Sequence, residues 1–183
     1  MSTTTQPVDQ QVAAGRYALD AIHSSAGFAV EHAGVSTFRG GFKPIEATLI
    51  ADSEGLTLEG TVRVEDITVD DENLRPHLLS PEFFDAERFP AVAFRTTEIS
   101  GPADDLRVAG ELSMAGFSIP VEAQGRLRGP VSGPAGDMIS LSLEAVIDRT
   151  DYGMNWQMEL PGGGSALGNQ VKLVADLELH KEA

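Results

Sequence analysis

The feature that most constrains this chain is an alternation of apolar and polar residues with a period of two. Successive side chains of a strand point to opposite faces, so every second residue shares a face. The clearest run is LRVAGELSM at 106–114, where Leu, Val, Gly, Leu and Met hold the even positions. Similar runs occupy 26–30, 45–49, 56–64, 92–94, 117–127, 139–147 and 171–179. Helical spacing fits none of them, so the pattern predicts an all-β chain.

The connections between these runs favour an antiparallel arrangement. Ala115 and Gly116 form a two-residue link between strongly alternating segments, as a hairpin requires. Eight long strands can close into a barrel or pack as a sandwich, and the pattern alone leaves both open. We favour an eight-stranded antiparallel barrel, because closure removes exposed strand edges and leaves an interior that side chains or one small ligand can fill.

One segment, NLRPHLLSPEFFDAERFP at 73–90, departs from the strand pattern. Asn73 can cap a short helix that tolerates Pro76 in its first turn. Ser80 followed by Pro81 predicts a second helix start. The segment carries a large apolar surface from Leu74, Leu78, Leu79, Phe83 and Phe84. We therefore expect a short helical insert that caps one end of the barrel.

Charge and composition narrow the classes of partner. The formal net charge of −15 opposes phosphate backbones and anionic membrane surfaces, so we expect no nucleic-acid partner. The chain has no cysteine, which excludes disulfides, thiolate metal sites and a cysteine nucleophile. It also lacks a run of about 18 apolar residues, so we expect no membrane insertion.

The N-terminal segment differs in composition from the rest of the chain. Residues 1–15 have neither the basic start nor the apolar stretch of a secretory signal. We expect a cytoplasmic protein in which residues 1–15 form a flexible tail and residues 16–183 form a single domain.

Four stretches give the chain a resemblance to the YceI family over roughly residues 16–180. They are YxLDxxHS at 17–24 with FxVxH at 28–32, FxGxF at 38–42, HLLSPEFFD at 77–85 with Phe89-Pro90 and Phe94, and GxLxMxG at 110–116 with DRTDYG at 148–153. Two positions depart from the family pattern. Pro76 stands where an acidic residue is frequent, and Tyr152 replaces a frequent Phe.

The resemblance implies a lipocalin-like antiparallel barrel whose elongated apolar tunnel takes up a polyisoprenoid or similar amphiphile. It also implies a homodimer and brings no catalytic residue set. We expect a non-enzymatic protein that binds, carries or sequesters an isoprenoid or other long-chain lipid. The alternative is a pathway enzyme that uses the barrel as a reaction chamber for an apolar substrate. A weaker alternative is a stress-response interaction protein with a fully packed core.

The candidate ligand contacts lie on the apolar strand faces, on the insert and near the DRTDYG stretch. They are Phe28, Val30, His32, Phe42, Leu78, Phe83, Phe84, Phe94, Leu112, Met114, Phe117, Arg149, Met154 and Trp156. Small residues on the inward rows would leave room along the barrel axis. These are Gly110, Ala123, Gly125, Ala145 and Ala175.

The remaining polar motifs favour structural roles. His23, His32 and His77 lack the short spacings of a metal-ligand set, so we expect hydrogen-bonded structural histidines and no metal. Asp148 and Arg149 could form an acid/base set or a diphosphate anchor, but a network that ties a strand end to a loop is favoured. No cofactor is expected apart from a non-covalently bound polyisoprenoid or fatty amphiphile.

Overall fold

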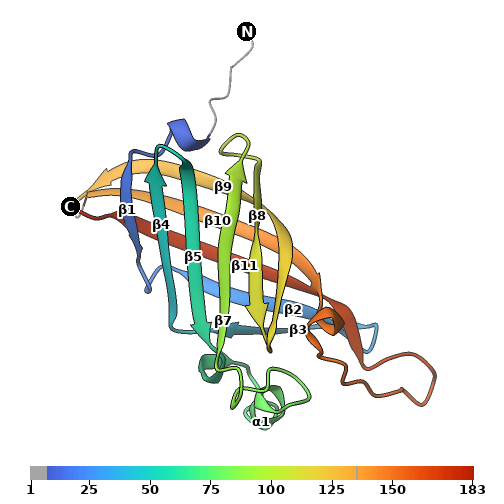
Figure 1. The fold of residues 1–183 in the computed structure, drawn as a ribbon. Coiled ribbons are helices and arrows are strands. Elements are labelled where there is room, and N and C mark those ends of the chain that lie inside the picture. The colour runs from blue at the N-terminus through green and yellow to red at the C-terminus, as the bar shows by residue number, and fades with distance from the viewer. Residues whose placement is uncertain (1–7, 135) are drawn as a thin grey trace.

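The computed structural model describes residues 8–134 and 136–183, and its strands form one continuous antiparallel sheet (Figure 1). The strands are β1 (Gly15–Leu19), β2 (Ser25–His32), β3 (Ser36–Phe42), β4 (Ile45–Asp52), β5 (Gly55–Arg63), β6 (Ile67–Thr68), β7 (Ala91–Ser100), β8 (Leu106–Met114), β9 (Phe117–Gly133), β10 (Gly136–Asp148) and β11 (Leu167–Lys181). Their order in the sheet is β1-β4-β5-β7-β8-β9-β10-β11-β2-β3-β6, with a further pairing of β1 and β11.

The sheet closes because β11 pairs with two successive segments of one bent strand. Its first part pairs with β2 through Val171 and Val30, and its last part pairs with β1 through Leu179 and Leu19. Strands β3 and β4 form the next bent strand, which pairs with β2 and β1 in turn. The result is a closed barrel of eight long antiparallel strands. The predicted architecture is confirmed.

The N-terminal segment packs against one end of this barrel. The 3-10 helix η1 (Val8–Gln10) lies there, with Val8 only 1% exposed and its N–H donating to the carbonyl of Gly101 at 3.2 Å. The Tyr17 hydroxyl donates to the Ala13 carbonyl at 2.9 Å. The prediction of a flexible tail over residues 1–15 is therefore wrong for residues 8–15, because buried valines anchor them. Residues 1–7 lie outside the described part.

The helical insert covers the opposite end (Figure 1). It contains one helix, α1 (Arg75–Leu79), with Pro76 in its first turn as expected. The prediction of a cap at Asn73 is wrong, since the N-cap position is Leu74 and Asn73 donates to Asp71 instead. The second predicted helix is also absent, because residues 81–84 form turns. Two further 3-10 helices, η2 (Val64–Asp66) and η3 (Arg149–Tyr152), flank this end.

The barrel interior contains two hydrophobic clusters, one toward each end. The first includes Tyr17, Leu49, Leu106 and Leu179, each 0% exposed. The second joins the insert to the strands below it and includes Leu78, Phe83, Phe84, Leu112, Met114 and Tyr152. Apolar residues therefore occupy the alternating inward positions along the whole barrel.

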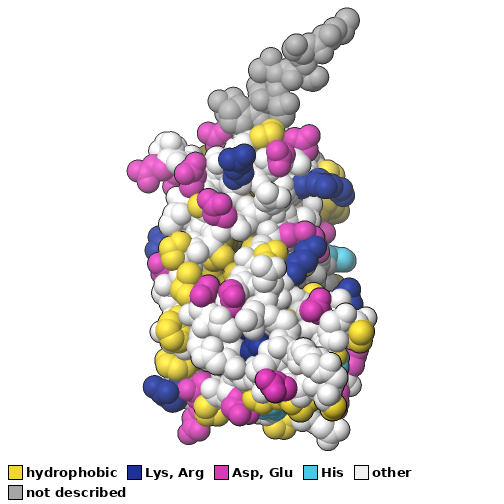
Figure 2. Space-filling view, turned by 90° about the vertical axis from the view of Figure 1, so that its right-hand side faces the viewer, with side chains coloured by type: hydrophobic (Ala, Val, Ile, Leu, Met, Phe, Trp, Pro, Cys, Tyr) yellow, Lys and Arg dark blue, Asp and Glu magenta, His cyan; other side chains and the backbone are white. Residues whose placement is uncertain are grey.

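The outer surface is largely polar, with acidic side chains distributed over the face in Figure 2. Hydrophobic side chains on that face gather along its left side and at its lower end, where the insert lies. Among the described residues, no helix is both long and apolar enough to cross a bilayer.

Candidate ligand-binding cavity

A cavity of about 620 Å³ extends from the middle of the barrel to the insert. Ligand sites typically enclose about 300–1,000 Å³ and have mostly apolar walls. The walls here come from strands on different sides of the barrel. Val62 of β5 and Phe94 of β7 line it, as do Val171 and Leu173 of β11. The strictly buried residues Tyr17, Leu49 and Leu106 do not line it, so the η1 end is filled while the α1 end is hollow.

The hollow follows from small residues that meet in register. Ala47 pairs with Gly60 and Ala26 with Ala175 across neighbouring strands. Ala123 likewise pairs with Ala145, and all six residues line the cavity. Each pair places two short side chains next to each other at one level, although a larger residue follows on the next strand, as Phe94 does beside Gly60 and Leu173 beside Ala145.

Three of the five small residues predicted to leave room do line the cavity, and two do not. A Cβ added at Gly110 would lie 2.6 Å from the Arg95 carbonyl oxygen and from the Phe94 ring. One added at Gly125 would lie 2.4 Å from the Ser142 carbonyl oxygen. These glycines permit close packing of strands, and the prediction for them was wrong. Sequence reasoning missed Gly60, where an added Cβ has no neighbour closer than 3.7 Å.

Aromatic rings form one wall of the cavity beneath the insert. Phe28 lies across Gly40, whose missing Cβ would fall 2.4 Å from the Phe28 ring. The Phe28 and Phe42 ring centroids are 6.1 Å apart, and Phe42 meets Phe84 edge to face at 5.9 Å. The ring of Phe84, from the insert, therefore continues the wall built by β2 and β3.

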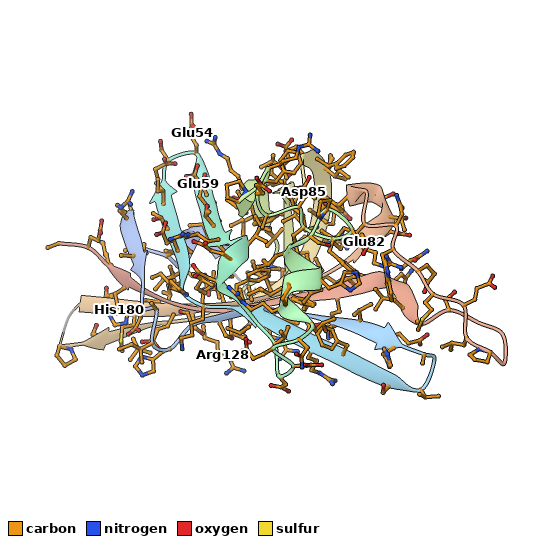
Figure 3. All side chains as sticks on the ribbon, turned by 90° about the horizontal axis from the view of Figure 1, so that it is seen from below. Glu54, Glu59, Glu82, Asp85, Arg128 and His180 are labelled. Carbon is orange, nitrogen blue, oxygen red and sulfur yellow. The ribbon has the colours of Figure 1, made fainter. Side chains whose placement is uncertain are left out.

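A second aromatic group, His77, Phe83 and Trp156, borders the cavity at the insert. His77 lies edge to face against both Phe83 at 4.9 Å and Trp156 at 5.2 Å between ring centroids. Its Nε2 is 2.6 Å from Glu82 Oε2, which fixes the imidazole. Seen from below, the insert that carries Glu82 and Asp85 lies across the barrel end (Figure 3). These contacts join the insert to the 154–156 segment.

Arg149 places a buried guanidinium at the cavity wall, with 3% of the residue exposed. It donates to the carbonyls of Gly168, Met154 and Trp156 and to Asn169 Oδ1. Burial lowers the pKa of this guanidinium. Asp148 makes no ion pair with it and instead accepts from the N–H and hydroxyl of Thr150, which lowers the pKa of the Asp148 carboxyl. Arg149 alone therefore ties the strand end to the loop, and the favoured Asp148–Arg149 network is wrong in its ion pair, because Asp148 bonds to Thr150 instead.

The structure gathers all but one of the predicted contacts around this cavity. They are Phe28, Val30, His32, Phe42, Leu78, Phe83, Phe84, Phe94, Leu112, Met114, Arg149, Met154 and Trp156. Their contact with a ligand stays a prediction.

Phe117 is the exception. It has the predicted strand parity and pairs with Met114 across the Ala115–Gly116 turn, but it is 47% exposed beside Gly153. The prediction that it lines the tunnel was wrong, because a shared parity does not place both residues of the last hairpin pair against the cavity.

The three histidines compared in the sequence do not converge on one another. His77 contacts Glu82, His23 contacts Asp20, and His32 is exposed without a side-chain hydrogen bond to a described residue. The prediction of a hydrogen-bonded histidine is wrong for His32. The structure instead brings His180 of β11 to the pair formed by His23 and Asp20.

Comparison with known proteins gives the chain a family. The model of the YceI-like domain matches residues 17–179. A UPF0312 protein of Staphylococcus epidermidis is 31% identical over 168 residues, covering 89% of this chain and 96% of the relative. A UPF0312 protein of Staphylococcus aureus is 28% identical over 169 residues, covering 88% of this chain and 95% of the relative.

Solved structures share the fold at low identity. BcnA of Burkholderia cenocepacia aligns with a TM-score of 0.72 and 18% identity, covering 87% of this chain and 98% of that one. A polyisoprenoid binding domain from Saccharophagus degradans aligns with a TM-score of 0.71 and 11% identity, covering 91% and 98%. With the family model matching nearly the whole domain, this chain belongs to the YceI-like domain family.

Proposed function

We propose that this protein binds, carries or sequesters an isoprenoid or another long-chain amphiphilic lipid in its barrel cavity. The observation that supports this most is the cavity of about 620 Å³ with apolar walls on opposite sides of the barrel. Each buried CH₂ group contributes ~0.8 kcal/mol, so about ten contribute roughly 8 kcal/mol before the costs of binding. Apolar contact alone therefore supports useful affinity.

Two further observations favour a carrier that leaves its ligand unchanged. The Arg149 donors at the cavity wall are directed at carbonyls of the chain itself. His77 is held by Glu82 at the insert. Neither group has the arrangement of a base aligned with a second reactive group. The name of the Saccharophagus degradans relative, a polyisoprenoid binding domain, supports a lipid of that class.

The first test is native mass spectrometry of gently purified protein, followed by solvent extraction. We expect one long-chain lipid per barrel, with the same mass before and after incubation. An empty barrel that also fails to take up added prenyl alcohols or fatty acids would contradict the proposal. A homodimer, which the family resemblance implies, stays a prediction for light scattering on the same sample.

A substitution at the wall tests where the lipid binds. Leu112 lines the cavity, whereas Glu111 on the opposite face of β8 accepts a hydrogen bond from Ser118. We expect Leu112→Trp to occupy the hollow, retain a folded barrel and lose lipid uptake. If the site were instead a closed core, the larger ring would overpack it at a cost of about 1–3 kcal/mol. Glu111→Gln is the matched control and should retain both uptake and stability.

A further inference from the structure

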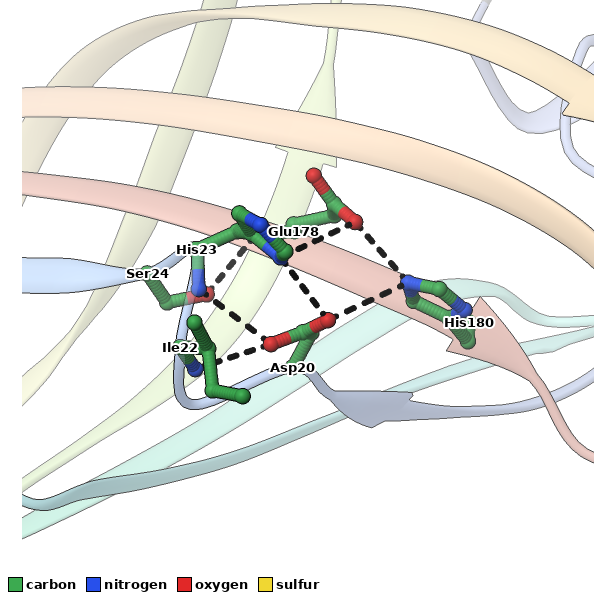
Figure 4. Close-up of polar contacts among 6 residues, drawn as sticks. All are labelled: Asp20, Ile22, His23, Ser24, Glu178 and His180. Carbon is green, nitrogen blue, oxygen red and sulfur yellow. Dashed lines mark hydrogen bonds and ion pairs between the residues drawn. The ribbon is translucent and has the colours of Figure 1, made fainter. Parts of the chain in front are cut away.

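A group of two histidines and two carboxylates lies outside the barrel, far along the chain from the insert residues. Asp20 and His23 belong to the segment 20–24, which joins the two parts of the bent strand β1–β2. Glu178 and His180 are two residues apart on β11, so their side chains share one face of that strand. Figure 4 shows all four side chains directed toward one another.

The four potential ligand atoms form a closed ring of short distances. His23 Nδ1 is 3.0 Å from Asp20 Oδ2 and 3.9 Å from Glu178 Oε1. His180 Nε2 is 2.9 Å from the same Glu178 oxygen and 3.7 Å from the same Asp20 oxygen. Ligands about 2.0–2.2 Å from a tetrahedral zinc ion are separated by about 3.3–3.6 Å from each other. The ligand atoms of Asp20, His23 and Glu178 all lie within 4.8 Å of one another, and His180 Nε2 borders this trio on the side of the two carboxylates.

The backbone holds the segment in this position. The Asp20 N–H donates to the Glu178 carbonyl at 2.8 Å, and the Glu178 N–H donates to Oγ of the buried Ser24 at 2.9 Å. Asp20 Oδ1 accepts from the N–H groups of Ile22 and His23, which leaves Oδ2 directed at the two imidazoles. Asp20, His23 and Glu178 are therefore held together as a trio, and the His180 imidazole completes a set of four ligands by turning toward His23.

The charge of the group favours a cation. Asp20 and Glu178 have no lysine or arginine partner within ion-pair distance among the described residues, and only the two histidines approach them. The two carboxylates add to the acidity of a protein whose formal net charge is −15, which attracts cations.

We propose that Asp20, His23, Glu178 and His180 form a binding site for a divalent transition-metal ion of the zinc type. Imidazole with carboxylate suits zinc and its neighbours, whereas calcium and magnesium take oxygen ligands. The bound ion joins the bend of β1–β2 to β11, the strand through which the barrel closes. This site is separate from the lipid cavity, because neither Asp20, His23, Glu178 nor His180 lines it.

Calorimetric titration of chelator-treated full-length protein with ZnCl₂ tests the site. We expect one zinc ion per chain, a raised melting temperature, and no heat from CaCl₂ or MgCl₂. His23→Ala and His180→Ala should each weaken zinc binding about 100-fold and abolish the rise in melting temperature. His23 is exposed and His180 is half-buried on the outer face of β11, so circular dichroism of the variants should match the parent.

His32→Gln is the matched control, since His32 is an exposed histidine outside the group. It should bind zinc as the parent does. Absence of stoichiometric zinc binding would overturn the proposal, as would parent-like affinity in either alanine variant. Visible absorption of the Co²⁺-loaded protein gives a second readout, because the ligand-field bands of a four-coordinate site should disappear in both alanine variants.

Discussion

The two ends of the barrel are built from the same strands but differ in how their interiors are filled. At the η1 end, Tyr17, Leu49 and Leu106 are fully buried and pack against one another. From the middle of the barrel to the α1 end the interior is hollow, with pairs of alanine and glycine in register along its inner part and aromatic rings beneath the insert. The alternation of residues decides which side chains point into the barrel. The size of each side chain and of its cross-strand neighbour decides whether the interior at that height is filled or hollow.

The two tyrosines show the same contrast in polar terms. The Tyr17 hydroxyl at the filled end donates to the Ala13 carbonyl, which holds the N-terminal segment in place. The Tyr152 hydroxyl near the hollow end is buried without a hydrogen-bond partner among residues 8–134 and 136–183. The hydroxyl of Tyr17 therefore stabilises the filled end through a hydrogen bond, whereas the hydroxyl of Tyr152 is an unsatisfied polar group.

The largest expected effect is a loss of stability at the filled end. Leu106→Ala removes a fully buried side chain from a packed cluster, so we expect it to cost about 2–5 kcal/mol of unfolding free energy. Leu173→Ala removes the same atoms from the cavity wall, where the side chain already borders empty space. We expect a clearly smaller cost there, measured by urea denaturation. Equal costs would mean that the two ends are equally packed.

Glycine substitutions sharpen the contrast next. Gly110→Val forces a side chain against the Arg95 carbonyl, and we expect a loss of about 1–3 kcal/mol. Gly60→Val extends into the cavity without a close backbone neighbour, so stability should change little. Its effect should be on binding instead, as a preference for shorter lipid chains in extraction experiments. A severe loss of stability in Gly60→Val would show that the wall cannot accept added volume.

The tyrosines should respond to the same change with opposite signs. Tyr17→Phe leaves the Ala13 carbonyl without its partner and should cost about 1 kcal/mol. Tyr152→Phe removes an unsatisfied buried hydroxyl and should raise the unfolding free energy by about 1 kcal/mol. Chemical denaturation at neutral pH measures both. Destabilisation by Tyr152→Phe would point to a water molecule bonded to that hydroxyl.

The smallest effect concerns alkaline pH. Burial raises the pKa of both Tyr17 and Tyr152 above the ordinary value of 10.0, with Asp137 and Asp151 adding to the shift. Above that value the unfolded chain releases tyrosine protons that the folded chain keeps, so stability falls as pH rises through the folded-state pKa. Between about pH 9 and 11, stability should decline less steeply in the Tyr17→Phe, Tyr152→Phe double variant than in the parent. If the unfolding free energies of the parent and the double variant fell in parallel with pH, other titrating groups would cause the decline.

The sequence by itself determined the strand content, the inward rows, the capping insert and the family. These depend on local alternation and on short motifs, such as HLLSPEFFD at 77–85, that can be read along the chain. All but one of the ligand contacts predicted from them line the cavity. Phe117, Gly110 and Gly125 were misassigned for one reason: they have the right parity, but parity carries no information about how far a side chain at a hairpin end is covered or about which backbone approaches a glycine.

Only the tertiary structure decided which distant residues meet. Val8 packs against the η1 end of the barrel, and Ala47 aligns with Gly60, only once the strands have paired in register. The approach of His180 to His23 depends on closure of β11 against the bent β1–β2 strand, across more than 150 positions of the chain. Spacing along the sequence indicates shared faces within one strand, whereas contacts between strands are set by register and closure, which no local pattern encodes.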